Sequence, residues 1–270
     1  MSEHRAFGQV ASKDGTIIAY ERLGSGPPLV LVVGALCSRR LGPSLELSPR
    51  LASQFTVFSY DRRGRGESGA GGAHRVQLEI DDLEALIAEA GGSAFVFGHS
   101  SGAILALQAA AHGAAIRKLA LYEAPLMVEP GGPTMQAEWQ AIRAFIAQGR
   151  RSEALKVFLK AVGVPAFVVA IMRWLPVWRK LTAVAHTLPY DGAISEEFQR
   201  AEPLPANVWQ PVTIPVLACA GGKSPAWMLN GMRALARALA NAEHRVIEGQ
   251  SHEVAAGALE PVLKEFFGVG

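Results

Sequence analysis

The chain has 270 residues, of which 50% are apolar and 19% are charged, so it can bury a sizeable core and global disorder is excluded. Its 26 basic and 24 acidic side chains give a net charge of +2, which indicates no nucleic-acid partner. Two cysteines, Cys37 and Cys219, are too few for a disulfide framework or a cysteine-rich zinc site.

The N-terminal residues carry mixed charge and lack the apolar stretch of a secretory signal. The longest uncharged apolar run, residues 161–172, has 12 residues. A membrane-spanning helix needs about 20. We therefore expect a soluble, cytoplasmic protein with a small-molecule substrate and no membrane partner, and we leave open a homodimer.

Short aliphatic runs alternate with longer helical patterns along most of the chain. The runs that predict strands cover residues 16–23, 29–33, 55–60, 94–97, 118–122 and 216–220, with an edge strand at 244–247. Helical periodicity covers residues 78–90, 103–112, 228–240 and 258–267. The alternation predicts an α/β fold, with a doubly wound, mostly parallel sheet flanked by helices.

Residues 127–210 break this alternation, because they contain helical patterns and no convincing strand. Prolines divide the segment into short helices. We predict an inserted helical cap at 127–210, over the carboxyl edge of a core formed by residues 1–126 and 211–270. We expect its aromatic side chains to lie mostly in the core, including Trp139, Trp174, Trp178 and Phe167.

Residues 98–102 read Gly-His-Ser-Ser-Gly, between a predicted strand and a predicted helix. In this context a G-x-S-x-G turn projects its serine from the top of a sheet, and the positions beside the turn must be small. Ser100 is therefore the candidate nucleophile. It precedes a helix whose N-terminal N–H groups favour negative charge.

The order of three motifs resembles that of the α/β-hydrolase fold family. Residues 60–68, Tyr-Asp-Arg-Arg-Gly-Arg-Gly-Glu-Ser, match its D-x-R-G-x-G-x-S segment; residues 98–102 match its nucleophile elbow, and residues 249–252 match its C-terminal histidine loop. The resemblance covers nearly the whole chain. It implies an esterase-like hydrolase with a serine nucleophile and with its acid after the sixth strand.

The segment from Asp61 to Ser68 is rich in arginine. An anion site is one interpretation. We favour a turn braced by hydrogen bonds of Asp61 and Ser68, with the arginines in solvent.

A serine nucleophile needs a base, and the base needs an acid that orients it. The family's chain order, serine then acid then histidine, makes His252 the candidate base. The loop after the strand 216–220, where many relatives carry an aspartate, has Ser224 instead. Glu123, directly after the preceding strand, is the candidate acid, since a buried carboxylate is costly unless it is paired. Glu253 is a weaker rival, because an adjacent residue rarely reaches its neighbour's ring.

The resemblance also implies two backbone N–H donors for an oxyanion hole. One is Ser101, which follows the nucleophile. Matching Gly34 to the family's glycine makes Ala35 the other, with Leu36 as the fallback. Val33 stands where relatives often carry a histidine, and Cys37 is interpreted as a packed residue.

Together these residues predict a serine hydrolase without cofactor or metal, with Ser100, His252 and Glu123 as its triad. Small to medium carboxylic esters or lactones are the expected substrates, cleaved through an acyl-enzyme. Carbon–carbon bond hydrolysis and perhydrolysis are same-fold alternatives that keep a serine, and fold analogy does not separate them. A receptor-like homologue that hydrolyses slowly is a third, because Ser224 and Val33 depart from the family pattern.

Overall fold

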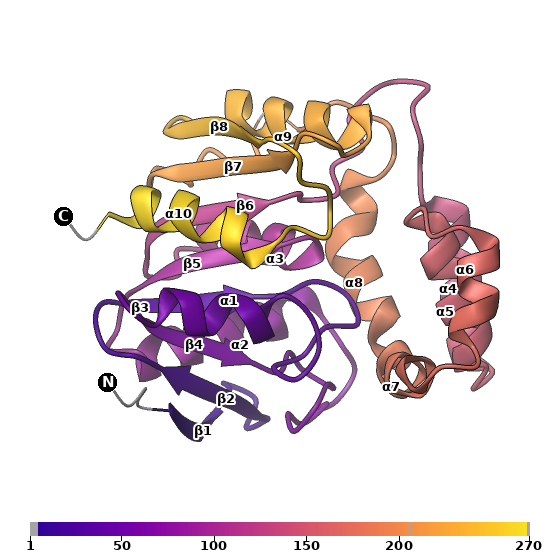
Figure 1. Cartoon of the computed structure of the whole chain (residues 1–270), viewed down its shortest axis with the longest axis horizontal. Coiled ribbons are helices and arrows are strands. Elements are labelled where there is room, and N and C mark those ends of the chain that lie inside the picture. The colour runs from indigo at the N-terminus through magenta and orange to yellow at the C-terminus, as the bar shows by residue number, and fades with distance from the viewer. Residues whose placement is uncertain (1–4, 206, 269–270) are drawn as a thin grey trace.

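The computed structural model describes residues 5–205 and 207–268. Its strands are β1 (Arg5–Ala11), β2 (Ile17–Leu23), β3 (Pro28–Val32), β4 (Thr56–Tyr60), β5 (Ala94–His99), β6 (Ile116–Tyr122), β7 (Val216–Gly221) and β8 (Ala242–Ile247). They form one sheet in the order β1-β2-β4-β3-β5-β6-β7-β8 (Figure 1). Strands β3 to β8 are parallel to one another, whereas β1 pairs antiparallel with β2, and β2 antiparallel with β4.

Helices cover both faces of the sheet. One face packs against α1 (Ser44–Leu51) and α10 (Ala256–Phe267), and the other against α2 (Val76–Glu89), α3 (Ser101–Ala111) and α9 (Ala226–Ala238). Successive side chains of a strand point to opposite faces. In β3, Leu29 and Leu31 therefore enter the first core, and Val30 and Val32 the second. The predicted doubly wound, mostly parallel sheet is confirmed.

Each predicted strand and helix is present, with both ends within two residues of the predicted ones. The sequence analysis missed helix α1. Its eight residues contain Pro49 and follow Pro43, so helical propensity is low there. Leu47 and Leu51 nevertheless bury themselves against the sheet, which shows that tertiary packing stabilises this helix.

Between β6 and β7 the chain forms a helical insertion on one side of the sheet (Figure 1). Its helices are α4 (Gln136–Ala147), α5 (Arg151–Ala161), α6 (Ala166–Met172), α7 (Pro176–Val184) and α8 (Leu188–Ser195), with short 3-10 turns at Ala185–Thr187 and Glu196–Phe198. The insertion has a core of its own around Trp139, Ile142 and Leu155. Helix α8 contacts α2 and α3 and so joins the insertion to the sheet. The boundaries at 127–210 stay a prediction.

Two aromatic side chains of the insertion lie in solvent instead of the core. Trp174 is 90% exposed and Phe167 is 68% exposed, whereas Trp139 and Trp178 are buried as expected. Helix α6 is apolar over its whole length and buries only Val169, so most of its apolar surface faces outward. In the described part of the chain no helix is long and apolar enough to cross a lipid bilayer.

The expectation that the arginines after β4 lie in solvent is wrong. Arg62, Arg63 and Arg65 are at most 1% exposed. The expected bracing of the turn is present, because the Ser68 hydroxyl donates a hydrogen bond to the carbonyl oxygen of Asp61 at 2.6 Å. A buried guanidinium group is tolerated only where carboxylates neutralise it.

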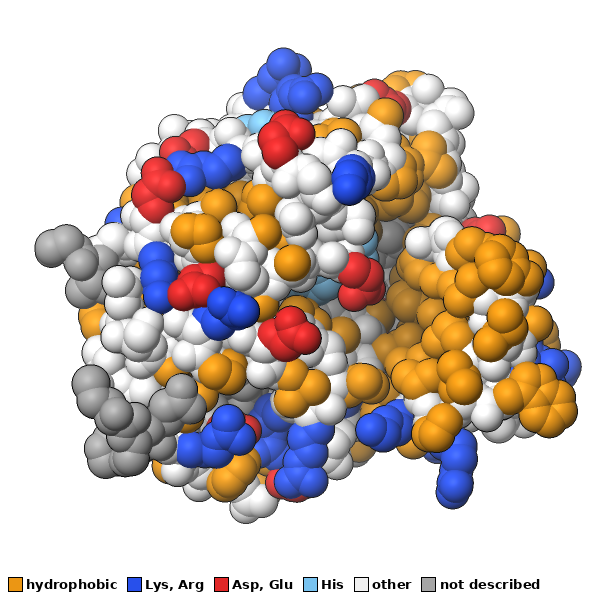
Figure 2. Space-filling model, in the orientation of Figure 1, with side chains coloured by type: hydrophobic (Ala, Val, Ile, Leu, Met, Phe, Trp, Pro, Cys, Tyr) orange, Lys and Arg blue, Asp and Glu red, His pale blue; other side chains and the backbone are white. Residues whose placement is uncertain are grey.

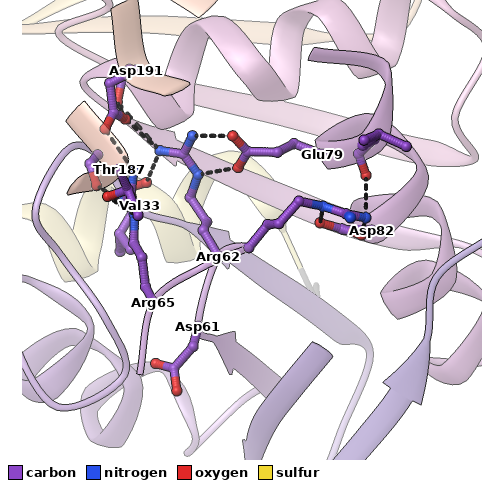
Figure 3. A network of polar contacts seen from close by, with 12 residues as sticks. Val33, Asp61, Arg62, Arg65, Glu79, Asp82, Thr187 and Asp191 are labelled. Carbon is purple, nitrogen blue, oxygen red and sulfur yellow. Dashed lines mark hydrogen bonds and ion pairs between the residues drawn. The ribbon is translucent and has the colours of Figure 1, made fainter. Parts of the chain in front are cut away.

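Those carboxylates come from distant parts of the chain (Figure 3). Arg62 donates to both oxygens of Glu79 at 2.7 and 2.9 Å and to Asp191 at 2.8 Å, and Arg65 donates to Asp191 at 2.7 Å. Arg63 pairs separately with Asp82. Burial works against the charged form of Arg62, but Glu79 and Asp191 outweigh it and hold the pKa of Arg62 above its usual value.

Replacing Asp191 by alanine should lower the free energy of unfolding by about 3–5 kcal/mol, because two buried guanidinium groups would lose a shared carboxylate. Urea unfolding at pH 7 measures this. Glu265→Ala removes an exposed ion pair with Arg245 and should change stability far less. Equal losses in the two variants would contradict this role of Asp191.

Candidate active site

Ser100 lies in the tight turn between β5 and α3, with φ 57° and ψ −130°. This conformation costs a non-glycine residue about 1–3 kcal/mol, so its surroundings must hold it. The Ser100 N–H donates to the carbonyl oxygen of Tyr122 at 2.9 Å. A Cβ on Gly98 would lie 2.6 Å from a backbone atom of α3, and a Cβ on Gly102 would collide with the backbone of β3. The turn therefore requires the two glycines, as the sequence indicates.

Glu123 follows β6 directly and is fully buried. Its Oε2 accepts a hydrogen bond from Nδ1–H of His252 at 2.8 Å. Its Oε1 accepts from the N–H of Gly221 at 2.7 Å and from the hydroxyl of Ser224 at 2.5 Å. Burial acts to raise the pKa of Glu123, but these three hydrogen bonds together outweigh it and hold that pKa below its usual value. The carboxylate is therefore ionised where it meets His252.

Ser224 stands in the loop after β7, where the resemblance led us to look for a carboxylate. The structure shows that its hydroxyl donates a hydrogen bond to Glu123, the residue that follows the neighbouring strand β6. The sequence analysis treated Ser224 only as a departure from the family pattern and missed this contact. Parallel strands β6 and β7 end at the same sheet edge, with Tyr122 opposite Cys219, so residues that follow both strands meet there.

His252 lies in the loop between β8 and α10, and its side chain is 38% exposed. Two contacts fix this loop: Nε2–H of His99 donates to the carbonyl oxygen of His252 at 3.1 Å, and the Tyr122 hydroxyl donates to that of Ser251 at 2.6 Å. Because Nδ1–H of His252 is given to Glu123, its Nε2 can accept a proton. The rival acid, Glu253, is exposed.

His99 was not among the sequence candidates, yet it packs against His252 with 4.8 Å between ring centroids. Its Nδ1 is buried without a hydrogen-bond partner in the described structure. Burial, and next the nearby His252, lower the pKa of His99 to about 3. His99 is therefore neutral at pH 7 and supports the backbone of the histidine loop.

The loop after β3 approaches Ser100 closely. A Cβ on Gly34 would lie 2.7 Å from Cβ of Ser100, so only glycine permits this approach. Arg65 donates to the carbonyl oxygen of Gly34 at 2.6 Å, and Arg62 donates to that of Val33 at 3.3 Å. These buried arginines support the loop in which the family's usual histidine is missing.

The side chain of Ser101 joins the site to the same arginine cluster. Its hydroxyl donates to Asp191 at 2.7 Å, and Asp191 belongs to α8 of the insertion. Cys37, in the loop after β3, is a free cysteine and is partly buried. Burial raises the pKa of its thiol to about 11, so little thiolate is present at neutral pH.

Ser100, His252 and Glu123 border one cavity of about 100 Å³ between the sheet edge and the insertion. Ala35 and Ser101, the sequence candidates for the oxyanion hole, line it as well. The rest of the lining is mainly apolar and includes Met127, Met135, Trp139, Phe158, Trp227 and Met228. Over residues 5–205 and 207–268, Ser100 and His252 share no hydrogen bond, and no cluster of three or more potential metal ligands occurs.

A model of the alpha/beta hydrolase family matches residues 13–262. An alpha/beta hydrolase of known structure from Sphaerobacter thermophilus DSM 20745 is 46% identical to this chain, with a TM-score of 0.88 over 97% of this chain and 100% of that one. The chain belongs to the alpha/beta hydrolase family. No curated protein matches it.

Two more distant structures share the fold of this alpha/beta hydrolase. A hydrolase from Pseudomonas aeruginosa PA01 is 22% identical, with a TM-score of 0.75 over 97% of this chain and 98% of that one. An enol-lactonase from Burkholderia xenovorans LB400 is 20% identical, with a TM-score of 0.72 over 96% and 99%. At these identities the likeness concerns the fold alone.

The neutral, buried His99 should make this alpha/beta hydrolase less stable in acid. Its folded pKa of about 3 lies below the unfolded value of about 6.5, so only the unfolded chain binds this proton between those pH values. Stability is unaffected above pH of about 6.5 and falls as the pH drops below it. Urea unfolding at pH 7 and at pH 5 gives the fall in the free energy of unfolding between these pH values. This fall should be smaller in His99→Gln than in the wild type, by up to about 2 kcal/mol. Parallel losses would contradict the lowered pKa.

Proposed function

We propose that this alpha/beta hydrolase is a serine hydrolase of small to medium carboxylic esters or lactones. Ser100 is the nucleophile, His252 the general base and Glu123 the acid that orients it. The observation that carries the proposal is the hydrogen bond from Nδ1–H of His252 to the buried, ionised Glu123, beside a cavity that Ser100 also lines. This is the arrangement that activates a serine hydroxyl.

In the acylation step, Oγ of Ser100 attacks the carbonyl carbon of the ester while Nε2 of His252 accepts its proton. The ionised Glu123 stabilises the resulting imidazolium and keeps its ring in place. The backbone N–H groups of Ala35 and Ser101 donate to the developing oxyanion. Neither N–H donates to a carbonyl group within the described chain, which leaves both free for this purpose.

As the tetrahedral intermediate collapses, His252 gives its proton to the leaving alkoxide, and Ser100 remains acylated. Water then enters, loses a proton to Nε2 of His252 and attacks the acyl carbonyl. The acid departs with the proton restored to Ser100. These steps use only side chains and backbone groups of this chain and need no cofactor.

The cavity supports small, largely apolar substrates. Its volume is about 100 Å³, and thioether and aromatic side chains form most of its wall. The hydroxyl of Ser195 is buried in that wall without a hydrogen-bond partner in the described structure. A polar group of the substrate would satisfy it, since a buried hydroxyl gains from any partner it finds. An ester or lactone with one further oxygen fits this lining.

Ser100→Ala and His252→Ala should each lower kcat for p-nitrophenyl acetate and butyrate by about 10⁴–10⁶, because each removes a group that acts in the transition state. Initial rates measured with pure protein test this. Ser53→Ala, on the surface away from the cavity, is the matched serine control and should keep full activity.

The same assay separates the alternatives. Ester turnover that persists in Ser100→Ala would refute the proposal. No turnover in the wild type, with rapid labelling of Ser100 by an organophosphonate, would favour carbon–carbon bond hydrolysis or perhydrolysis. Slow labelling, together with a ligand-induced rise in melting temperature, would favour the receptor-like homologue.

Glu123→Gln should lower kcat by about 10²–10⁴, because the neutral amide no longer stabilises the imidazolium. Ser224→Ala removes one of three hydrogen bonds to that carboxylate, so its effect should be smaller, about tenfold. Glu253→Gln is the matched control beside His252 and should be nearly silent. A reversed ranking of Glu123→Gln and Glu253→Gln would move the acid role to Glu253.

A further inference from the structure

The outer end of the insertion carries an unusual amount of exposed apolar surface. Five of the nine large apolar side chains that are exposed in the described chain lie between residues 162 and 175: Val162, Phe167, Ile171, Trp174 and Leu175. Figure 2 shows a broad orange area over the lobe that holds α4 to α6. We name these five residues the α6 patch. Contiguous apolar surface of this kind marks an interaction site.

The charged side chains that lie near the α6 patch along the sequence, between residues 154 and 190, have one sign. Lys160, Arg173, Arg179 and Lys180 are all exposed, and blue side chains border the orange area in Figure 2. The sequence has no Asp or Glu between residues 154 and 190. An apolar face with an exposed tryptophan and a rim of lysine and arginine is typical of segments that lie in the interface of anionic membranes.

A second copy of the chain fits this surface less well. In a symmetric dimer the same surface contacts itself, so the basic side chains of both copies would be brought into one interface. Like charges brought together in this way oppose association, and no carboxylate of the segment offsets them. An anionic lipid surface attracts every one of these charges.

The α6 patch is also continuous with the cavity. Val162 is 50% exposed and at the same time lines the cavity wall, next to Ala161 and Phe158. Figure 2 shows the orange surface running from the lobe into the hollow beside it. A lipid surface that binds the α6 patch would therefore lie next to the cavity wall. Apolar molecules are concentrated in the lipid, so they would be close to the cavity.

We propose that the α6 patch docks this protein onto anionic lipid surfaces, with Phe167, Ile171 and Trp174 inserted among the lipids and the basic rim on their headgroups. The sequence analysis expected no membrane partner because no run is long enough to span a bilayer; docking in the interface needs no such run. The proposal does not depend on the role of Ser100.

Co-sedimentation with vesicles tests the proposal on the full chain. We expect binding to phosphatidylcholine vesicles that contain about one third phosphatidylserine, and much weaker binding to phosphatidylcholine alone. Binding should weaken as salt is added, because the rim charges are exposed. Trp174 is 90% exposed, so its fluorescence should shift to the blue on binding and this shift should vanish in Trp174→Phe.

Matched variants locate the contact. Phe167→Ser should weaken binding by roughly tenfold. Phe7→Ser removes a phenylalanine of similar exposure, 64% against 68%, at the far edge of the sheet, and should leave binding unchanged. Arg173→Gln with Lys180→Gln should weaken binding by about 25-fold, since each charge near an anionic surface contributes about fivefold.

Three outcomes would overturn the proposal. The first is no binding to anionic vesicles in low salt. The second is an equal loss in Phe7→Ser and Phe167→Ser. The third is a dimer in sedimentation velocity that Phe167→Ser dissociates while vesicle binding is absent, which would assign the patch to a second copy. Because vesicle binding is measured without substrate, an inactive protein that docks would refute only the proposed hydrolysis.

Discussion

The carboxylate of Asp191 lies between two buried guanidinium groups, and much of the site depends on that charge balance. Arg62 and Arg65 each hold Asp191 with one N–H and a carbonyl of the loop after β3 with another. Asp191 in turn accepts a hydrogen bond from the hydroxyl of Ser101, next to Ser100. One cluster of charges thus connects the helical insertion, the loop after β3 and the start of α3. Each of these ions is buried, so loss of Asp191 would leave Arg62 with Glu79 alone and would remove the carboxylate that pairs with Arg65. The three segments therefore depend on one another for their positions.

The candidate triad depends on a chain of hydrogen bonds that ends at His252, whose side chain is 38% exposed. Ser224 and Gly221 fix the carboxylate of Glu123, which fixes the ring of His252, while His99 fixes the backbone behind that ring. The strain at Ser100 is held by the glycines around the turn and by the end of β6. Buried supports therefore surround a histidine that lines the cavity between the sheet edge and the insertion.

The sheet and the three candidate residues were predictable because their signals are local. Aliphatic runs define the central strands, and the elbow places Ser100 within five residues of sequence. Glu123 follows from its position at the end of a buried strand. The burial of the arginines was not predictable in the same way. Three arginines within four residues predict a solvated turn. Their partners lie as far away in the sequence as residue 191, on the insertion, and the strand pattern does not determine the path of that insertion. The exposure of Phe167 in α6 and of Trp174 just after it was missed for a related reason. Composition does not distinguish an apolar helix in the core from one at the surface.

The contact between Ser101 and Asp191 has a bearing on how proteins of this fold diverge. An insertion between β6 and β7 resembles a free module, since it has its own core and leaves the sheet by two connections. In this chain the insertion cannot be replaced freely. A replacement without an acidic residue at the position of Asp191 would leave the buried Arg65 without that carboxylate, and Arg62 with Glu79 alone, beside the Ser100 turn. A relative could therefore accept a different insertion only if the arginines after β4 and the acidic residue of the insertion were inherited together. The history of the insertion and that of the turn after β4 should therefore be linked.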